Sequence, residues 1–430
     1  MNNLIKDTIT ELKTFIRLWS TQSLSQLGST MTSFALTLWL YDKTGSALQT
    51  ALLSICSYAP YVLMSIFAGA LSDRWDKKKV MLICDTLAAG STIVIFVLLR
   101  LDLLIPAHLY MLNAVNGLMN TVQQPASDVA MTLITPKKYY QQTSGMRSFS
   151  QSLITILHPI CATTLYAFGG MDVVIYVDLA TFAVAFLMLL FGVKIPKMDW
   201  TDKQKESILK AAGEGLRYLR DNNLILVLIL FLAGVNLVAS AFDAVLPAYI
   251  LPRDNGGDTM LGIVMSCAGV ATLIGSLIVT ILPAPKNRVK VVYLTMLISL
   301  STENFMLAFG KTPILWCISQ IVGWILVPVM STNLDVILRS TIPPEMQGRV
   351  YSCRNTLQFF TIPVGFFMGG IMVDKVCEPW MKSVENSEFW TMLFGVGKGS
   401  GAALMMFILG VLGTSICLVF GKILNKYNRK

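Results

Sequence analysis

Four charged residues inside long apolar stretches are arranged as two acid–base pairs. Asp128 and Asp335 each lie before a short polar turn, and Arg147 and Arg354 follow the same turns at a similar distance. At ~1.5 Å per helical residue, the acid and the base of each hairpin reach the same depth. Because a charge in the middle of a membrane helix costs ~2.5–3.5 kcal/mol, we expect each Asp to pair with its Arg. Such pairs can neutralise charge in a static bundle or take part in a gate, and both interpretations stay open.

Asp243 is an intramembrane carboxylate of another kind. It lies in the apolar segment 238–247, with no basic residue at helical spacing. An unpaired acid in such surroundings suits proton exchange or the attraction of a cationic drug. The competing interpretation is a solvated acid near the end of its helix.

Residues for enzyme chemistry are scarce. His108 and His158 stand alone, and the sequence has neither a phosphate-binding glycine loop nor a metal-ligand cluster. Seven of the eight cysteines lie in apolar runs without paired spacing, which excludes a disulfide framework. We therefore expect no catalytic residues, no metal and no cofactor.

Composition places the elements that carry these charges in a lipid bilayer. Of 430 residues, 54% are hydrophobic and 14% are charged, whereas soluble domains carry about 25% charged residues. The chain reads as an all-α membrane protein with twelve transmembrane helices. The expected helices are 18–41, 46–72, 79–100, 105–135, 138–167, 172–194, 223–250, 259–283, 289–310, 313–340, 345–374 and 400–424.

Basic residues give the orientation. One set of alternate loops, with both termini, holds 25 Lys and Arg, and the other set holds 7. The positive-inside rule then places both termini in the cytoplasm. The net charge of +9 is thereby explained without nucleic acid, and we expect a multi-pass protein of the cell membrane.

A repeat divides the chain into halves. A shift of 207 residues superposes Asp128 on Asp335 and Arg147 on Arg354, which indicates a duplicated six-helix unit. We expect an N-terminal bundle with an interfacial N-terminus at 1–194, a cytoplasmic linker with an amphipathic helix at 195–222, and a C-terminal bundle at 223–430.

The basic turn 69–79 resembles a family signature. Gly69, Leu71, Asp73 and Arg74, followed by three lysines at 77–79, are similar to the motif between helices 2 and 3 of the major facilitator superfamily, except that Asp76 replaces its second glycine. The resemblance implies two pseudo-symmetric six-helix bundles around a path that opens alternately to each side. Further islands resemble the macrolide-efflux and siderophore-exporter branch; they are 42–46, 195–197, 214–215, 344–350 and 374–375.

Two departures leave proton coupling without motif support. Proton antiporters of the family often carry an arginine where this chain has Asn116, and the glycines of the antiporter motif in helix 5 are missing around His158 and Pro159.

The resemblance also assigns the path and the gate. Helices 1, 4, 7 and 10 line the path in this fold, whereas helix 9, which holds Glu303, is peripheral. The expected path residues are Asp243, Gln22, Gln26, Asn113, Asn116, Asn120, Asn236, Gln320 and Trp324. The expected cytoplasmic gate residues are Gly69, Asp73, Arg74, Asp128, Arg147, Asp335, Arg349 and Arg354.

The leading functional prediction is a monomeric secondary transporter that exports amphipathic, macrolide-type compounds in exchange for protons. Few polar groups converge in apolar helices, which suits a hydrophobic substrate better than a sugar. Alternatives are a transporter of siderophores or lysophospholipids with the same fold, and a membrane scaffold or sensor that transports nothing.

Overall fold

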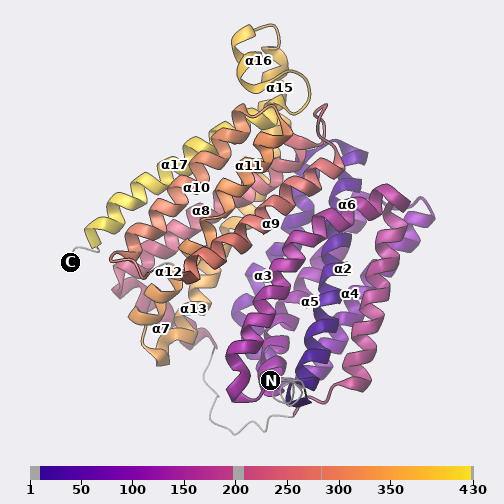
Figure 1. Cartoon of the computed structure of the whole chain (residues 1–430), viewed down its shortest axis with the longest axis vertical. Coiled ribbons are helices and arrows are strands. Elements are labelled where there is room, and N and C mark those ends of the chain that lie inside the picture. Colours follow the sequence, from indigo (N-terminus) through magenta and orange to yellow (C-terminus); the bar gives the residue numbers. More distant parts are fainter. Residues whose placement is uncertain (1–9, 197–207, 282, 428–430) are drawn as a thin grey trace. The chain divides into compact units, whose positions relative to one another are not determined.

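A computed structural model describes residues 10–196, 208–281 and 283–427. Within these ranges the side chains at 65–74, 137, 141, 208–212, 339, 344, 345, 347, 348 and 352 are not described. In the described part every regular element is helical (Figure 1). The chain forms two compact units: unit 1 comprises 1–36 and 63–206, and unit 2 comprises 37–62 and 207–430.

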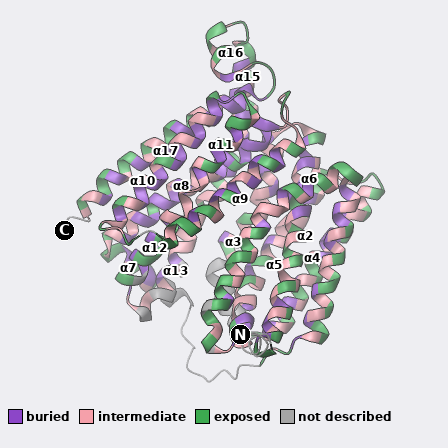
Figure 2. Ribbon diagram, in the orientation of Figure 1, coloured by how far each residue is buried: buried purple, intermediate pink, exposed green. Residues whose placement is uncertain are grey.

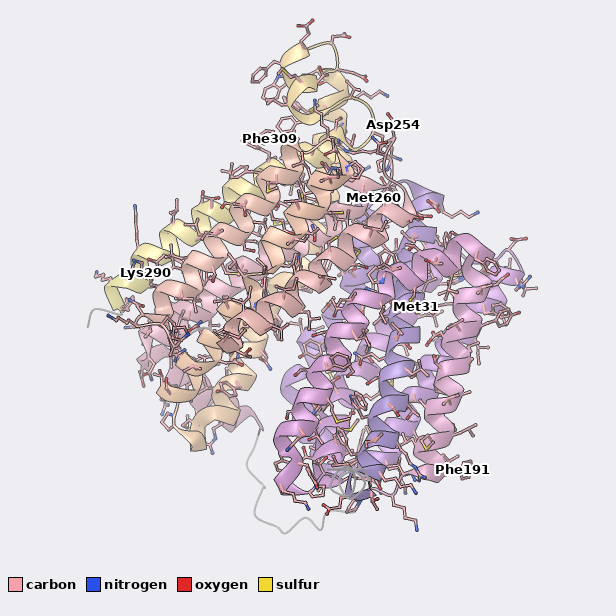
Figure 3. The ribbon with its side chains drawn as sticks, viewed as in Figure 1. Met31, Phe191, Asp254, Met260, Lys290 and Phe309 are labelled. Carbon is pink, nitrogen blue, oxygen red and sulfur yellow. The ribbon has the colours of Figure 1, made fainter. Side chains whose placement is uncertain are left out.

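Two helices contribute to both units, and the remaining elements of unit 1 follow in chain order. The shared helices are α2 (Lys13–Thr44) and α3 (Ala47–Arg74). Unit 1 continues with α4 (Lys77–Arg100), α5 (Pro106–Leu133), η1 (Lys137–Tyr139), α6 (Tyr140–Leu187) and η2 (Met188–Gly192). Helix α4 begins at Asp76, whose side chain accepts from the amide of Lys79 at 3.1 Å. Figure 3 labels Phe191 in η2, which is exposed.

Helix α6 contains two of the predicted helices. The backbone is non-helical at Gly169 and Gly170, and Gly170 has φ of +66°, a conformation that residues with a Cβ rarely adopt. The predicted boundary between 138–167 and 172–194 is confirmed at this break. The stretch Gln142–Gly192 has 51 residues, about twice the length that one bilayer crossing needs.

Unit 2 begins with the short helix α7 (Ile208–Asp221), where the sequence predicts an amphipathic helix. The helices that follow are α8 (Asn223–Ile250), α9 (Asp258–Ile281), α10 (Arg288–Phe309), α11 (Pro313–Trp324), α12 (Val327–Thr341), α13 (Pro344–Phe359), α14 (Thr361–Met372) and α17 (Ser400–Tyr427). Between α14 and α17 lie η4 (Val373–Cys377), α15 (Glu378–Ser383) and α16 (Glu388–Phe394).

Within unit 2 a central helix is buried, and the helices around it expose apolar side chains, as is typical of helices that face lipid. Helix α8 is buried along most of its length, whereas α9 and α17 carry exposed apolar residues such as Leu277 and Val419 (Figure 2). Nine helical stretches in the described ranges are long and apolar enough to cross a membrane. The structure is consistent with twelve crossings, because one stretch is long enough for two and the more polar α2 and α5 are long enough for one each.

Candidate functional site

Asp243 is the exception on an otherwise buried helical segment. From Ser240 to Ile250 of α8, every residue except Asp243 is buried. The carboxylate therefore reaches open space from a segment whose other side chains are buried. Asp243 also lies close enough to Tyr58 and Glu303 to interact with both electrostatically. A carboxylate held in this way can take up a proton or bind a cationic group.

Glu303 belongs to the same electrostatic neighbourhood, although its helix was predicted to be peripheral. It is 5% exposed, and its Oε1 has no hydrogen-bond partner among the described residues. The carboxyl group lies on Gly323 of α11, where a Cβ would come within 2.4 Å of it. The side chain of Trp324 forms a hydrogen bond with it. Glu303 thus connects α10 to two residues of α11.

Two other predicted path residues of unit 2 have different surroundings. Gln320 is 1% exposed, and its Nε2 has no partner in the described part of the chain. Asn236 donates to the carbonyl of Gln358 at 3.1 Å, which joins α8 to α13. The structure therefore brings Asp243 near Glu303, while Asn236 serves as a helix-to-helix contact.

The predicted path residues of unit 1 bond mostly within their own bundle. Gln22 donates to Asp85 at 3.3 Å and Gln26 to Gln151 at 3.2 Å. Asn113 donates to the carbonyl of Leu109 at 3.0 Å. The remaining two differ in burial: Asn116 has a buried Oδ1 without a partner in the described part, and Asn120 is exposed.

Two buried or half-buried aspartates of unit 1 were not predicted as site residues. Asp85 on α4 accepts from Gln22 and, at 2.5 Å, from Gln123 of α5. Asp178 on α6 is 4% exposed and accepts from Ser29 at 3.0 Å. The sequence signal was present, because both are acids in apolar runs. The helix assignment does not single them out, because neither acid lies on a helix that the resemblance assigns to the path.

The first of the two predicted ion pairs is formed. Arg147 and Asp128 make a salt bridge between α6 and α5, on side chains that are about half exposed. An unpaired charge inside a membrane helix costs free energy, and the salt bridge lowers this cost for α5 and for α6 at once.

The second predicted ion pair is not a direct salt bridge, although both of its residues are described. No nitrogen of Arg354 lies within 4.0 Å of a carboxylate oxygen of Asp335. The Nε of Arg354 donates instead to Gln358 at 3.0 Å, one turn along its own helix. Asp335 is exposed. Asp335 still interacts electrostatically with Arg354, so the second copy keeps its two charges near each other without the direct salt bridge of the first.

The other gate residues divide between described and undescribed positions. Arg349 on α13 makes a salt bridge with Glu214 on α7. Gly215, beside it, lets the helices meet, since a Cβ there would lie 2.7 Å from the carbonyl oxygen of Arg349. The side chains at Gly69, Asp73 and Arg74 lie outside the described residues, and their gate role stays a prediction.

Unit 2 also contains a helix joint that the sequence did not predict. Asp374 in η4 accepts from the Ser46 hydroxyl at 2.5 Å and from the amides of Ala47 and Leu48 at 3.0 and 2.9 Å. Its carboxylate therefore caps the N-terminus of α3 from a segment more than 300 residues away in sequence. Gly370 supports the joint, because a Cβ there would lie 2.6 Å from the Cα of Leu48.

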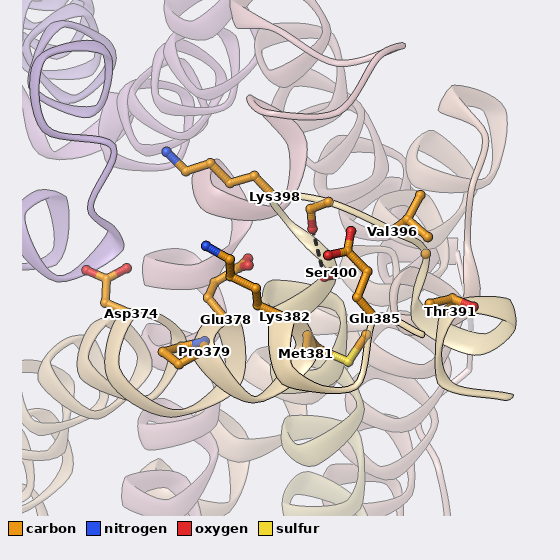
Figure 4. Close-up of a pocket in the computed structure, with 12 residues that line it drawn as sticks. Asp374, Glu378, Pro379, Met381, Lys382, Glu385, Thr391, Val396, Lys398 and Ser400 are labelled. Carbon is orange, nitrogen blue, oxygen red and sulfur yellow. Dashed lines mark hydrogen bonds between the residues drawn. The ribbon is translucent and has the colours of Figure 1, made fainter. Parts of the chain in front are cut away.

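A cavity of about 560 Å³ adjoins this joint (Figure 4). Its lining includes Asp374, Glu378 and Lys398. Glu378 accepts from the amide of Gly399 at 2.8 Å, and Lys398 lies over the ring of Tyr41 at 5.6 Å. The acids that line the cavity near the joint are thus engaged in holding helix ends.

Long apolar helices with a few ionisable groups between them define a multi-pass α-helical membrane protein. Residues 18–366 match the model of the Major Facilitator Superfamily. The chain belongs to this superfamily and is a transporter by fold and kinship.

Named relatives agree with this assignment. The chain is 24% identical over 368 residues to macrolide efflux protein A of Streptococcus pyogenes, covering 84% of this chain and 90% of that protein. It is 22% identical over 353 residues to the multidrug efflux pump Tap of Mycolicibacterium fortuitum, covering 78% and 83%. The solved structure of the nucleoside transporter NupG has the same fold, with a TM-score of 0.65, 14% identity and coverage of 94% and 98%.

Proposed function

We propose that this protein exports amphipathic, drug-like compounds of the macrolide type in exchange for protons. The observation that carries the proposal is Asp243, an exposed carboxylate on a buried segment of α8. Kinship with a macrolide efflux protein and a multidrug efflux pump supports the direction of transport and the substrate class.

In this proposal Asp243 alternates between a proton and the transported compound. Protonation removes the negative charge, so a bound cationic or polar group loses its electrostatic partner. Loss of the proton restores the charge and the affinity. Because a transporter can use only differences in affinity between its states, this competition couples the two movements.

The proposed gates are the ion pairs Asp128–Arg147 and Glu214–Arg349 and the helix joint at Asp374. With both termini in the cytoplasm, as the basic loops predict, the Asp128–Arg147 pair lies towards the cytoplasm and the Asp374 joint towards the outside. Alternating access requires contacts at one side to break while those at the other form. Hydrogen bonds to one carboxylate suit this task, because they break together when a helix end withdraws.

The test is a measurement of proton flux in proteoliposomes that contain the purified protein. A panel of macrolides, cationic dyes, catecholate siderophores and lysolipids is added, and the internal pH is followed. We expect macrolides or cationic dyes to release protons in a saturable way. A response to siderophores or lysolipids alone would assign another substrate class, and no proton movement with any transported compound would contradict antiport.

A further inference from the structure

Asp178 lies in the interior of unit 1, away from the groups used in the proposed function. It is 4% exposed on the second part of α6. Gly28 of α2 allows this approach: a Cβ there would lie 3.1 Å from the Oδ1 of Asp178 and 2.4 Å from the hydroxyl of Thr181. The glycine thus brings the backbone of α2 against a buried carboxylate.

Three hydroxyl groups from two other helices surround this carboxylate. Ser29 of α2 donates to Oδ1 at 3.0 Å, and Thr92 of α4 lies 3.5 Å from Oδ2. The hydroxyl of Thr32 is beside the same carboxyl group. Thr32 is 5% exposed, and its Oγ1 makes no hydrogen bond of normal geometry with any described residue. The Thr32 hydroxyl is therefore held beside the carboxyl group by a weak contact only, and its oxygen is available to a bound ion.

The charge of Asp178 has no protein counter-ion. Among the described residues, no Lys or Arg nitrogen lies within 4.0 Å of its carboxylate. Leaving a buried charge uncompensated costs about 3–5 kcal/mol. A proton or a monovalent cation can remove this single negative charge, whereas divalent ions in proteins generally bind more than one carboxylate.

Asp85, in the same unit, provides a comparison, because its carboxylate accepts hydrogen bonds from two amide groups of the protein. Its two partners, Gln22 and Gln123, present amide N–H groups, which bind anions and cannot ligate a cation. The partners of Asp178 are all oxygens, which can donate to a carboxylate or ligate a metal ion.

The distance between the oxygens of Thr92 and Asp178 also fits a cation. Na⁺ has nearly the radius of Ca²⁺, whose oxygen ligands lie at about 2.3–2.6 Å, so ligands at right angles are about 3.3–3.7 Å apart. The distance of 3.5 Å from Thr92 to Asp178 lies in this range. The hydroxyl of Ser29, at 3.0 Å, lies closer than this range and donates an ordinary hydrogen bond to the carboxylate.

We propose that Asp178, Ser29, Thr32 and Thr92 form a binding site for Na⁺ inside unit 1. The ion neutralises the buried carboxylate and joins α2, α4 and α6. Ser29 lies near the middle of α2, where transporters hold coupling ions close to the bilayer midplane. The site is independent of the transported compound and of Asp243.

Thermal unfolding of the purified full-length protein tests this site directly. Tm is measured in increasing NaCl, with choline chloride keeping the ionic strength constant at fixed pH. We expect Na⁺ to raise the Tm of the wild type in a saturable way. Asp178→Asn should abolish the response, whereas Asp85→Asn should retain it.

Thr32→Val provides a second test that does not alter the carboxylate. Its hydroxyl makes no normal hydrogen bond in the protein, so Tm without Na⁺ should stay unchanged while the apparent Kd for Na⁺ rises about tenfold. An equal Na⁺ response in wild type and Asp178→Asn would overturn the proposal. So would stabilisation of the wild type by acid with no effect of Na⁺, or an unchanged Kd in Thr32→Val if Asp178→Asn does not fold.

Discussion

Replacing Asp374 by Asn should loosen the joint between η4 and α3. The aspartate accepts three hydrogen bonds at the N-terminus of α3, from Ser46, Ala47 and Leu48. Asn keeps one acceptor oxygen but loses the negative charge. Bonds to charged groups contribute ~1.5–3 kcal/mol, those between neutral groups ~0.5–1.5, and the helix dipole adds ~0.3–1. Since such contributions are not additive, we expect a total loss of about 1.5–3 kcal/mol.

A thiol at position 51 reports on this joint. Ala51 is 1% exposed. A Cβ added at Gly370 of α14 would lie 3.0 Å from the Cβ of Ala51. In a background without the eight native cysteines, Ala51→Cys should be alkylated only when α3 separates from α14. Because 1.4 kcal/mol is a factor of ten in population, Asp374→Asn should speed alkylation by about 10- to 150-fold.

The control is a local cap elsewhere in unit 2. Asn287 caps α10 by accepting from the amide of Lys290 at 2.9 Å, so Asn287→Ala should cost about 1 kcal/mol of helix stability and leave alkylation at position 51 unchanged. Equal alkylation rates in Asp374→Asn and its parent would refute the reasoning, as would a similar acceleration by Asn287→Ala.

Three further predictions concern the contacts of α7 and the first ion pair. Gly215→Val should lower Tm, since its side chain would overlap the carbonyl of Arg349; overpacking costs ~1–3 kcal/mol, and an unchanged Tm would argue against close contact of α7 and α13. Tyr218→Phe should cost ~0.5–1.5 kcal/mol by losing the bond to a carbonyl 3.1 Å away. Burial raises the pKa of Tyr218, so this contribution is present below the unfolded pKa of about 10 and is lost as pH rises through the folded one. Asp128→Asn and Arg147→Gln should each lower Tm, and the double variant should lose less than the sum of the two.

The sequence predicted the membrane helices because composition and apolar length decide them. It also located the break in α6, since paired glycines at 169 and 170 interrupt an apolar run that is too long for one crossing. These features depend on residues that are neighbours in the chain. Local sequence is therefore sufficient for them.

Side-chain partners were predicted only in part, because they depend on competition among neighbours. The shift of 207 residues also superposes Gln151 on Gln358, so the repeat predicts the same surroundings for both. In the structure Gln151 accepts from Gln26, whereas Gln358 accepts from Arg354. One copy of the repeat therefore has the direct salt bridge and the other does not.

The unpredicted contacts of Asp374 and Asp178 have a common reason. Both carboxylates accept hydrogen bonds from neutral donors in distant segments, Asp374 from a helix N-terminus and Asp178 from the hydroxyl of Ser29. Pairing opposite charges at matching depth does not predict such partners, because they carry no charge. Intramembrane acids without a basic neighbour were the available signal.

Proton flux in proteoliposomes containing Asp243→Asn tests the central claim most directly. Wild type and variant are reconstituted in equal amounts, and equal Tm values establish that both are folded. We predict that a transported macrolide or cationic dye releases protons with the wild type and none with the variant, and that a proton gradient drives export only by the wild type. Uncoupler-sensitive export by Asp243→Asn at the wild-type rate would contradict the account.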